Sequence, residues 1–148
     1  MIFDTIKTMV ADHVEGSLIA QGYHFNVEGV NFSQFHQLFL EVYTDWTMQV
    51  DSLGEYIRIL SSGHEYVNPS MEVLVLNKTV KSKVLVGNKP IEMCTELLKI
   101  NDIIKSHFTT LFELATDENE QALADYCAIR LSEANKLNWK LVSITKGN

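Results

Sequence analysis

The chain has 148 residues, of which 46% are hydrophobic and 21% are charged, and its formal net charge is −7. This size and composition predict one globular domain, residues 1–148, that buries a core without disulfides or a structural metal. The sequence has no run of about 18 apolar residues and begins with helical spacing instead of a leader pattern, so we expect a cytoplasmic protein with no membrane span.

Two long helices are predicted in the first 60 residues. Apolar residues recur at spacings of three and four over residues 2–21, which indicates an amphipathic helix. For the second helix, Asn31 is the expected N-cap, with Gln34 as its partner in a capping box. This helix is expected to run to about Ile59 and to stop at Gly63.

A long connection follows, over about residues 63–89, and it is too long to be an unstructured loop in a compact domain. Asn68 as N-cap and Pro69 as first helical residue predict a short helix within it. The alternative is a strand over residues 73–76, because this apolar run is partly β-branched. We favour the helix.

The second half of the chain contains two more predicted helices. Pro90 opens one that runs to about Thr116, and Asp117 with Glu120 can cap another that ends near Ser143. Four long helices with one long crossover between the second and third are typical of an all-α, ferritin-like four-helix bundle with a short extra helix in that crossover.

Four side chains in the first two helices are candidate metal ligands: His24, His36, Asp51 and Glu55. Imidazole and carboxylate together are suited to iron and similar divalent metals, and acids four residues apart on a helix face the same side. Each residue alone is weak evidence, because a single histidine is more often a packed or surface residue and paired acids are common on solvated helix faces.

The spacing of these residues points to a site between two subunits. His36 and Asp51 are fifteen residues apart, which is about 22 Å along a helix, so one chain cannot use both ends in a single site. Around the helix axis Asp51 lies about 60° and Glu55 about 100° from His36, whereas Asp45 lies about 180° away. Two antiparallel copies related by a two-fold axis would bring the histidine end of one against the acidic end of the other.

The segments that carry these residues resemble the Dps family, also called mini-ferritins or DNA-protection-during-starvation proteins. "YHFNVEGVNFSQFHQLFLEVY" is similar to the family's two-histidine signature, and "DSLGEYI" to its acidic pattern, at the family's mutual spacing. Weaker similarity continues in "NPSMEVLVLN", "PIEMCTELL" and "NWKL". No Glu-x-x-His pair is present, which argues against the di-iron centre that other ferritins hold inside the bundle.

This resemblance implies a ferroxidase that works in a hollow dodecamer built from two-fold dimers. Its catalytic and metal-binding residues would be His24 and His36 of one subunit with Asp51 and Glu55 of its mate. The substrates would be Fe(II) and hydrogen peroxide or dioxygen, and ferric mineral would be stored inside. The resemblance also implies acidic iron-entry pores, for which Asp125 is the first candidate, followed by Glu120 and Glu118; the alternative is that these acids only complement a helix dipole.

The chain departs from the family pattern at several positions. Leu40 stands where a further acid is usual, which is expected to weaken a second iron position. Phe25 replaces the usual Trp after the first histidine, so Trp46 or Tyr43 would have to take up stray oxidising equivalents. Tyr56 replaces an arginine after the second acid, and the lysine-rich tail of some DNA-binding members is missing.

A second function remains open on these grounds, namely a Dps-like shell that binds and compacts DNA with weak or no ferroxidase activity. Residues 1–77 contain two basic and ten acidic residues, and residues 78–148 contain ten basic and nine acidic ones. Proteins that depend on phosphate contacts usually carry a basic stripe or tail, so DNA binding is possible but not favoured. The third possibility is a helical scaffold protein that has kept the bundle fold but no longer oxidises iron.

Overall fold

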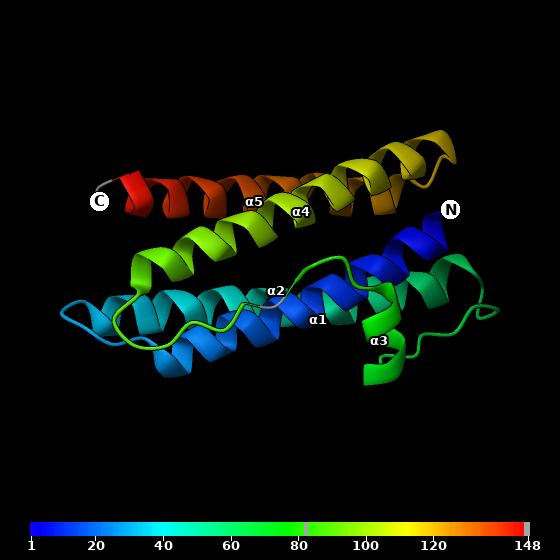
Figure 1. The fold of residues 1–148 in the computed structure, drawn as a ribbon. Coiled ribbons are helices and arrows are strands. Elements are labelled where there is room, and N and C mark those ends of the chain that lie inside the picture. The colour runs from blue at the N-terminus through cyan, green and yellow to red at the C-terminus, as the bar shows by residue number, and fades with distance from the viewer. Residues whose placement is uncertain (82, 147–148) are drawn as a thin grey trace.

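The computed structural model describes residues 1–81 and 83–146, and within them the chain forms four long helices and one short one (Figure 1). One antiparallel layer pairs the first two helices and the other pairs the last two. The crossover between α2 and α4 runs the length of the bundle and includes α3. The predicted all-α bundle with a long crossover is therefore confirmed, with helices α1 (Ile2–Asn26), α2 (Phe32–Leu60), α3 (Met71–Asn77), α4 (Pro90–Asp117) and α5 (Gln121–Lys146).

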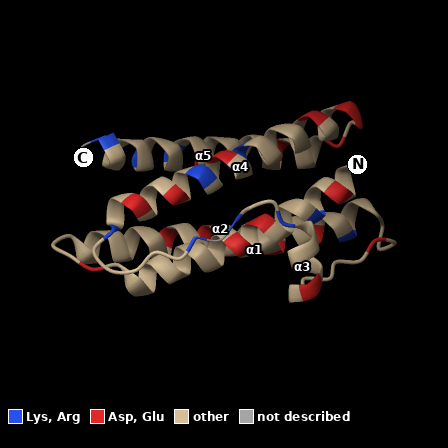
Figure 2. Cartoon of the chain, in the orientation of Figure 1, with Lys and Arg blue, Asp and Glu red and all other residues tan. Residues whose placement is uncertain are grey.

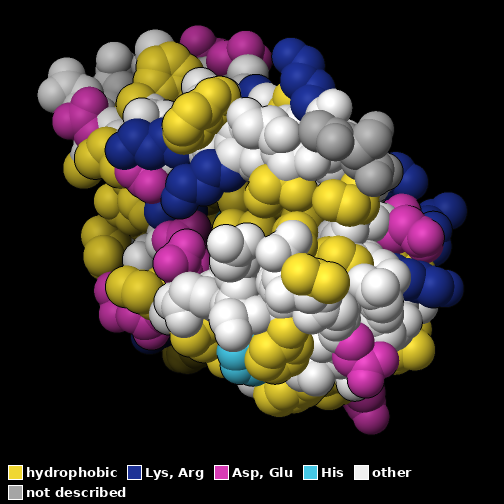
Figure 3. Space-filling view, turned by 90° about the vertical axis from the view of Figure 1, so that its left-hand side faces the viewer, with side chains coloured by type: hydrophobic (Ala, Val, Ile, Leu, Met, Phe, Trp, Pro, Cys, Tyr) yellow, Lys and Arg dark blue, Asp and Glu magenta, His cyan; other side chains and the backbone are white. Residues whose placement is uncertain are grey.

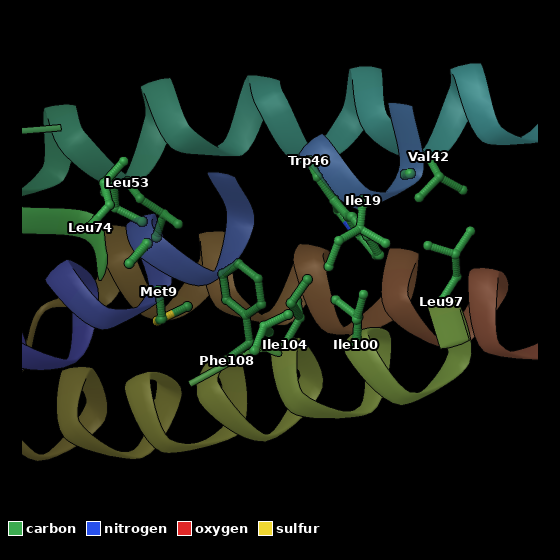
Figure 4. Packing of buried hydrophobic residues seen from close by; sticks show 14 of the residues in the cluster. Met9, Ile19, Val42, Trp46, Leu53, Leu74, Leu97, Ile100, Ile104 and Phe108 are labelled. Atoms are coloured by element: carbon green, nitrogen blue, oxygen red, sulfur yellow. The ribbon is translucent and has the colours of Figure 1, made fainter. Parts of the chain in front are cut away.

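The core lies between the two layers and receives apolar side chains from every long helix. Figure 4 shows several of those from α1, α2 and α4. Its largest members include Trp46, Phe39 and Phe108, each at most 2% exposed. Gly16 in α1 permits this packing, because a Cβ there would lie 3.0 Å from the Trp46 ring. The three-and-four spacing of apolar residues thus fixes how α1 and α2 are rotated about their own axes relative to the core. This rotation also determines which way the candidate ligands face.

The long helices α2 and α4 both end in a left-handed turn. After α2, Ser62 has φ 51° and Gly63 has φ 83°, and the Gly63 N–H donates to the Arg58 carbonyl at 2.9 Å. After α4, Asn119 has φ 59° and closes a similar turn. These are Schellman caps, in which the chain satisfies carbonyls of the last helical turn. The predicted stop at Gly63 is confirmed, although the left-handed region begins one residue earlier.

Several details of the predicted helix starts are wrong. Asp117, an expected cap of the last helix, is the final residue of α4, and α5 begins at Gln121. Asn31 does precede α2 as its N-cap residue, but its side chain makes no capping hydrogen bond, so the expected capping box is absent. The short helix α3 is confirmed over the strand alternative, but its N-cap is Ser70, whose Oγ accepts from the Val73 N–H at 3.4 Å. Asn68, the expected cap, instead accepts from the Ser70 N–H at 3.2 Å, and Pro69 precedes the helix.

A buried carboxylate fixes the crossover to the bundle. Asp12 of α1 is fully buried and accepts hydrogen bonds from the N–H groups of Thr79 (2.6 Å) and Val80 (2.8 Å), from the Thr79 hydroxyl and from His107 Nε2 of α4 (2.8 Å). Burial alone would raise the pKa of Asp12, but the hydrogen bonds from His107, Thr79 and Val80 lower it below its ordinary value. Asp12 therefore ties three segments together as an ionised group.

The charge asymmetry of the sequence appears in space as well. Basic residues follow the crossover and the C-terminal part of α5, whereas α1 and α2 carry mainly acidic ones (Figure 2). In residues 1–81 and 83–146, none of the helices combines the length and apolar character that crossing a bilayer requires.

Candidate metal centre

The first two candidate ligands, His24 and His36, lie together where α1 ends and α2 begins. His24 Nδ1 is 2.7 Å from the His36 carbonyl oxygen, and His36 Nδ1 is 2.7 Å from the His24 carbonyl oxygen. A carbonyl only accepts, so each Nδ1 carries a hydrogen, and the neutral form of each ring has its lone pair on Nε2. This reciprocal pair fixes both tautomers in the form in which a histidine binds a metal through Nε2.

The two imidazole rings are also stacked, with centroids 3.8 Å apart and planes 13° from parallel. Both side chains are half-buried, and the end of the bundle that contains them shows histidine atoms at its surface among hydrophobic and polar side chains (Figure 3). Within the described part of the chain, neither Nε2 has a hydrogen-bond partner. Both rings are thus held in place while one nitrogen of each remains available.

Aromatic side chains surround the histidine pair. Tyr43 lies edge-on to His24 at 5.4 Å, and Phe25, at 5.6 Å from the same ring, is largely exposed. Phe32 stacks on His36 at 4.9 Å, a contact that our sequence reasoning missed although their spacing of four residues at a helix start was the available signal. Trp46, the other aromatic expected near the site, is instead buried in the core against Gly16.

The two acidic candidates, Asp51 and Glu55, lie one turn apart near the other end of α2. Both are exposed, and neither has an ion-pair or hydrogen-bond partner among the residues that the structure describes. They line a shallow groove of about 350 Å³ together with Arg58 and apolar side chains. Four carboxylate oxygens are therefore available on one side of the helix.

The histidines and the acids do not meet within one chain. Fifteen residues of α2 separate His36 from Asp51, which corresponds to about 22 Å. Within residues 1–81 and 83–146, no group of three or more His, Cys, Asp or Glu side chains is close enough to hold a metal ion. Each chain thus carries two separate pairs of ligand groups.

Asp45, which the helix geometry placed on the opposite face, is half-buried and lies beside α5. Its carboxylate pairs with Arg130 of α5, with Nη1 to Oδ1 at 3.1 Å, and it also accepts from Gln49 Nε2 at 3.2 Å. Gln49 in turn accepts from the Tyr126 hydroxyl at 2.7 Å. This carboxylate is engaged in holding α2 against α5, which agrees with its exclusion from the site.

A third histidine, His13, is buried in the core and has different surroundings. Its Nδ1 lies 2.7 Å from the Met9 carbonyl, and its ring packs edge-on against Phe108 at 5.6 Å. Burial lowers its pKa to about 4, so it is neutral at ordinary pH. It is a core histidine and lies outside both pairs of candidate ligands.

The three acids expected to line an iron-entry pore lie at the turn between α4 and α5. Glu118 follows α4 directly, Glu120 precedes α5, and Asp125 lies in the second turn of α5. Asp125 and Glu118 are exposed, and Glu120 is half-buried. Leu40, the residue in place of a further acid, is half-buried one turn after His36.

Comparison with known proteins decides the family. The sequence profile of the ferritin-like domain matches residues 4–146. The chain belongs to the ferritin-like family. Among curated relatives, the DNA protection during starvation protein of Helicobacter pylori is 24% identical over 139 residues, which cover 94% of this chain and 94% of that protein. The resemblance to the Dps family predicted from the sequence is confirmed.

Solved structures show the same fold. The Dps protein of Staphylococcus aureus superposes with a TM-score of 0.86 and 24% identity, covering 97% of this ferritin-like chain and 94% of that one. The Dps protein of Vibrio cholerae is described as a member of the ferritin-like diiron-carboxylate superfamily. It superposes with a TM-score of 0.86 and 22% identity, covering 96% of this chain and 87% of that one. The ferritin-like bundle of our chain is thus that of the Dps structures.

Proposed function

We propose that this protein is an iron-oxidising and iron-storing mini-ferritin. Its whole chain would act as one domain, and its ferroxidase sites would form between two-fold related subunits of a dodecameric cage. His24 and His36 of one subunit would bind Fe(II) together with Asp51 and Glu55 of the other. The observation that carries this proposal is the division of the ligands: two fixed imidazoles at one end of α2 and two unpaired carboxylates about 22 Å away.

The ligand chemistry supports the oxidation of iron as the reaction. Each Fe(II) substrate gives up one electron, and two electrons with two protons convert hydrogen peroxide into two water molecules. Neutral imidazoles suit Fe(II), and the carboxylates Asp51 and Glu55 offset the positive charge that increases on oxidation. The Nδ1–H···O=C bonds keep the Nε2 lone pairs of both histidines available throughout.

The remaining predicted residues take secondary roles in this proposal. Tyr43, in contact with His24, would intercept a stray oxidising equivalent, and exposed Phe25 is less suited because its ring is harder to oxidise. Asp125, Glu120 and Glu118 would line the entry of iron where α5 begins in symmetry-related subunits. Leu40 leaves the second iron position one carboxylate short.

A stopped-flow measurement tests the proposal. Mixing the assembled apo-protein with Fe(II) and hydrogen peroxide should give a fast, stoichiometric rise in ferric absorbance that is lost in His36→Ala and Asp51→Ala. The matched controls are His64→Ala and Asp102→Asn, which change exposed residues of the same types outside the candidate centre. A rise of unchanged rate in both site variants would refute the assignment.

DNA compaction is the alternative, and it is favoured only by the name of the Helicobacter pylori relative. Several lysines that could contact phosphates are already beside carboxylates, such as Lys83 at 3.3 Å and Lys99 at 3.0 Å from Glu96. A gel shift at low salt that disappears at moderate salt would support DNA binding, and no shift at either salt concentration would exclude it.

A further inference from the structure

The acidic pair Asp51 and Glu55 has a cationic neighbour that does not pair with it. Arg58 is three residues after Glu55 and seven after Asp51, so all three lie on one side of α2, and all three line the same shallow groove. Long side chains on a helix lean toward its N-terminus, over the residues three and four positions earlier. For Arg58 those residues are Glu55 and Gly54.

Elsewhere in the chain the same spacing does produce ion pairs. Glu96 and Lys99 are 3.0 Å apart, and Glu133 and Lys136 are 3.4 Å apart, each at positions i and i+3. Glu55, by contrast, has no ion-pair partner among the described residues. Glu55 and Arg58 therefore have the spacing of an ion pair and do not form one.

The Arg58 guanidinium instead contacts the turn that follows α2. Arg58 Nη1 donates to the Gly63 carbonyl at 2.9 Å and to the Glu65 carbonyl at 2.7 Å. The guanidinium carbon lies 4.4 Å from the centre of the Tyr66 ring, a cation–π contact. Three contacts thus retain the cation at the end of the helix; we name them the Arg58 clamp.

The turn that supplies these acceptors is itself held in place. Its left-handed residues Ser62 and Gly63 form the Schellman cap, in which the Gly63 N–H donates to the Arg58 carbonyl. The Glu65 N–H donates to Ser61 Oγ at 3.0 Å, and the Glu65 carboxylate lies 3.2 Å from Lys7 Nζ of α1. The clamp is therefore part of the fold of this end of the bundle.

We propose that the Arg58 clamp is a positioning device that keeps Asp51 and Glu55 free of an internal counter-ion, with Tyr66 as its key residue. Without the clamp, Arg58 would turn back along α2 and form an exposed ion pair with Glu55. An incoming divalent cation would then have to displace the guanidinium before it could bind the carboxylates. This inference rests on the proposed function, because it assigns a role to residues beside the proposed half-site.

Titration calorimetry with Co(II) and the assembled protein tests the proposal. Co(II) is a suitable probe because it is not oxidised in the absence of peroxide. Tyr66→Ala should weaken Co(II) binding about two- to five-fold, the size expected for competition by an exposed ion pair. Tyr66→Phe keeps the ring and should bind as the wild type does. The double variant Arg58→Gln/Tyr66→Ala should also return to wild-type affinity, because no cation remains to compete.

These variants distinguish failure of the clamp proposal from failure of the proposed site. If Tyr66→Ala binds Co(II) as tightly as the wild type while Asp51→Asn binds more weakly, the clamp proposal is overturned and the proposed site stands. A loss in Tyr66→Ala that persists in the double variant also overturns the clamp, since it indicates a purely structural role for the ring. Equal affinity of the wild type and Asp51→Asn overturns the site and the clamp together.

A crystal structure of Tyr66→Ala checks the geometry without any metal. We expect an Arg58 guanidinium nitrogen within about 4 Å of the Glu55 carboxylate, the distance of an ion pair. A guanidinium that still lies on the carbonyls of residues 63 and 65 would overturn the proposal, because Tyr66 would then be unnecessary to the clamp.

Discussion

The two halves of the candidate centre are built in different ways. The histidine half is rigid before any metal arrives, because each ring is bonded to the backbone of the other helix and stacked on the other ring. The acidic half consists of two exposed side chains without partners on one helix face. The comparison indicates that His24 and His36 would set the geometry of the proposed site, whereas Asp51 and Glu55 would supply charge and adapt to the metal.

Removing one ligand from either half should have the largest effect of any change. His36→Ala and Asp51→Ala are each expected to lower the rate of peroxide-driven Fe(II) oxidation to that of free iron, because each removes one of the four proposed ligands from every site. If rigidity matters as we argue, Asp51→Glu should retain more activity than His36→Gln, since a carboxylate on a flexible stem can readjust. Stopped-flow rates of the four variants decide this, and the reverse ranking would contradict the comparison.

A change remote from both halves should affect stability and leave both intact. Asp12→Ala leaves the donors on Thr79, Val80 and His107 without their common acceptor, and we expect a loss of about 3–5 kcal/mol in the free energy of unfolding. Urea denaturation measures this loss. Co(II) affinity of the folded variant should match the wild type, and a parallel loss of affinity would show that the crossover shapes the site.

The same carboxylate predicts a pH dependence of stability. The pKa of Asp12 is lower in the folded protein than its ordinary value of 3.8, so its contribution is fully present above that pH and is lost as the pH falls through the folded pKa. Thermal unfolding should therefore show a decline below about pH 4 that is absent in Asp12→Asn. An equal decline in that variant would assign the acid sensitivity to other carboxylates.

Most of the architecture followed from the sequence, and the reasons are local. The spacing of apolar residues, Pro90 and Gly63 predicted the long helices and their ends within a few residues. The cap of α3 was misplaced because Asn68 and Ser70 are both good capping residues, and capping preference alone does not select between them. The stacked histidines could not be foreseen, because their contact depends on how the α1–α2 turn brings two helices together.

For the candidate site, helix geometry predicted which acids share a face and excluded Asp45. It could not identify Arg130 as the partner of Asp45, since that pair joins residues 85 positions apart. It also gave no sign of the Arg58 clamp, because the clamp depends on carbonyl groups whose direction is set by the turn after α2. The spacing of residues along the sequence does not reveal contacts between segments that are distant in the chain.

Adding an acidic residue beside the histidines makes the two halves of the candidate centre more alike and tests whether a carboxylate there reaches the metal. Leu40→Glu places a carboxylate one turn after His36 on the same face, and we expect binding of a second Co(II) to tighten about tenfold. Leu40→Gln is the control for the loss of the apolar side chain. Calorimetric titration measures both, and equal curves for the two variants would show that position 40 does not reach the metal.

The smallest effect is expected from the aromatic support of the histidine pair. Phe32→Ala removes the ring stacked on His36, which should cost about 0.5–1.5 kcal/mol of stability. Metal affinity should fall only slightly, because the Nδ1–carbonyl bonds remain. Phe25→Ala is the control, since that ring is largely exposed, and a larger loss from Phe25 than from Phe32 would contradict the role given to stacking.

The central claim is that the two halves come from different subunits, and co-assembly of two inactive variants tests it most directly. A site that takes its histidines from Asp51→Ala and its acids from His36→Ala is intact. Random co-assembly of equal amounts should therefore restore about a quarter of the wild-type ferroxidase rate. Each variant alone should remain inactive. A mixture as inactive as its parents, in particles shown by mass to contain both chains, would contradict the shared site.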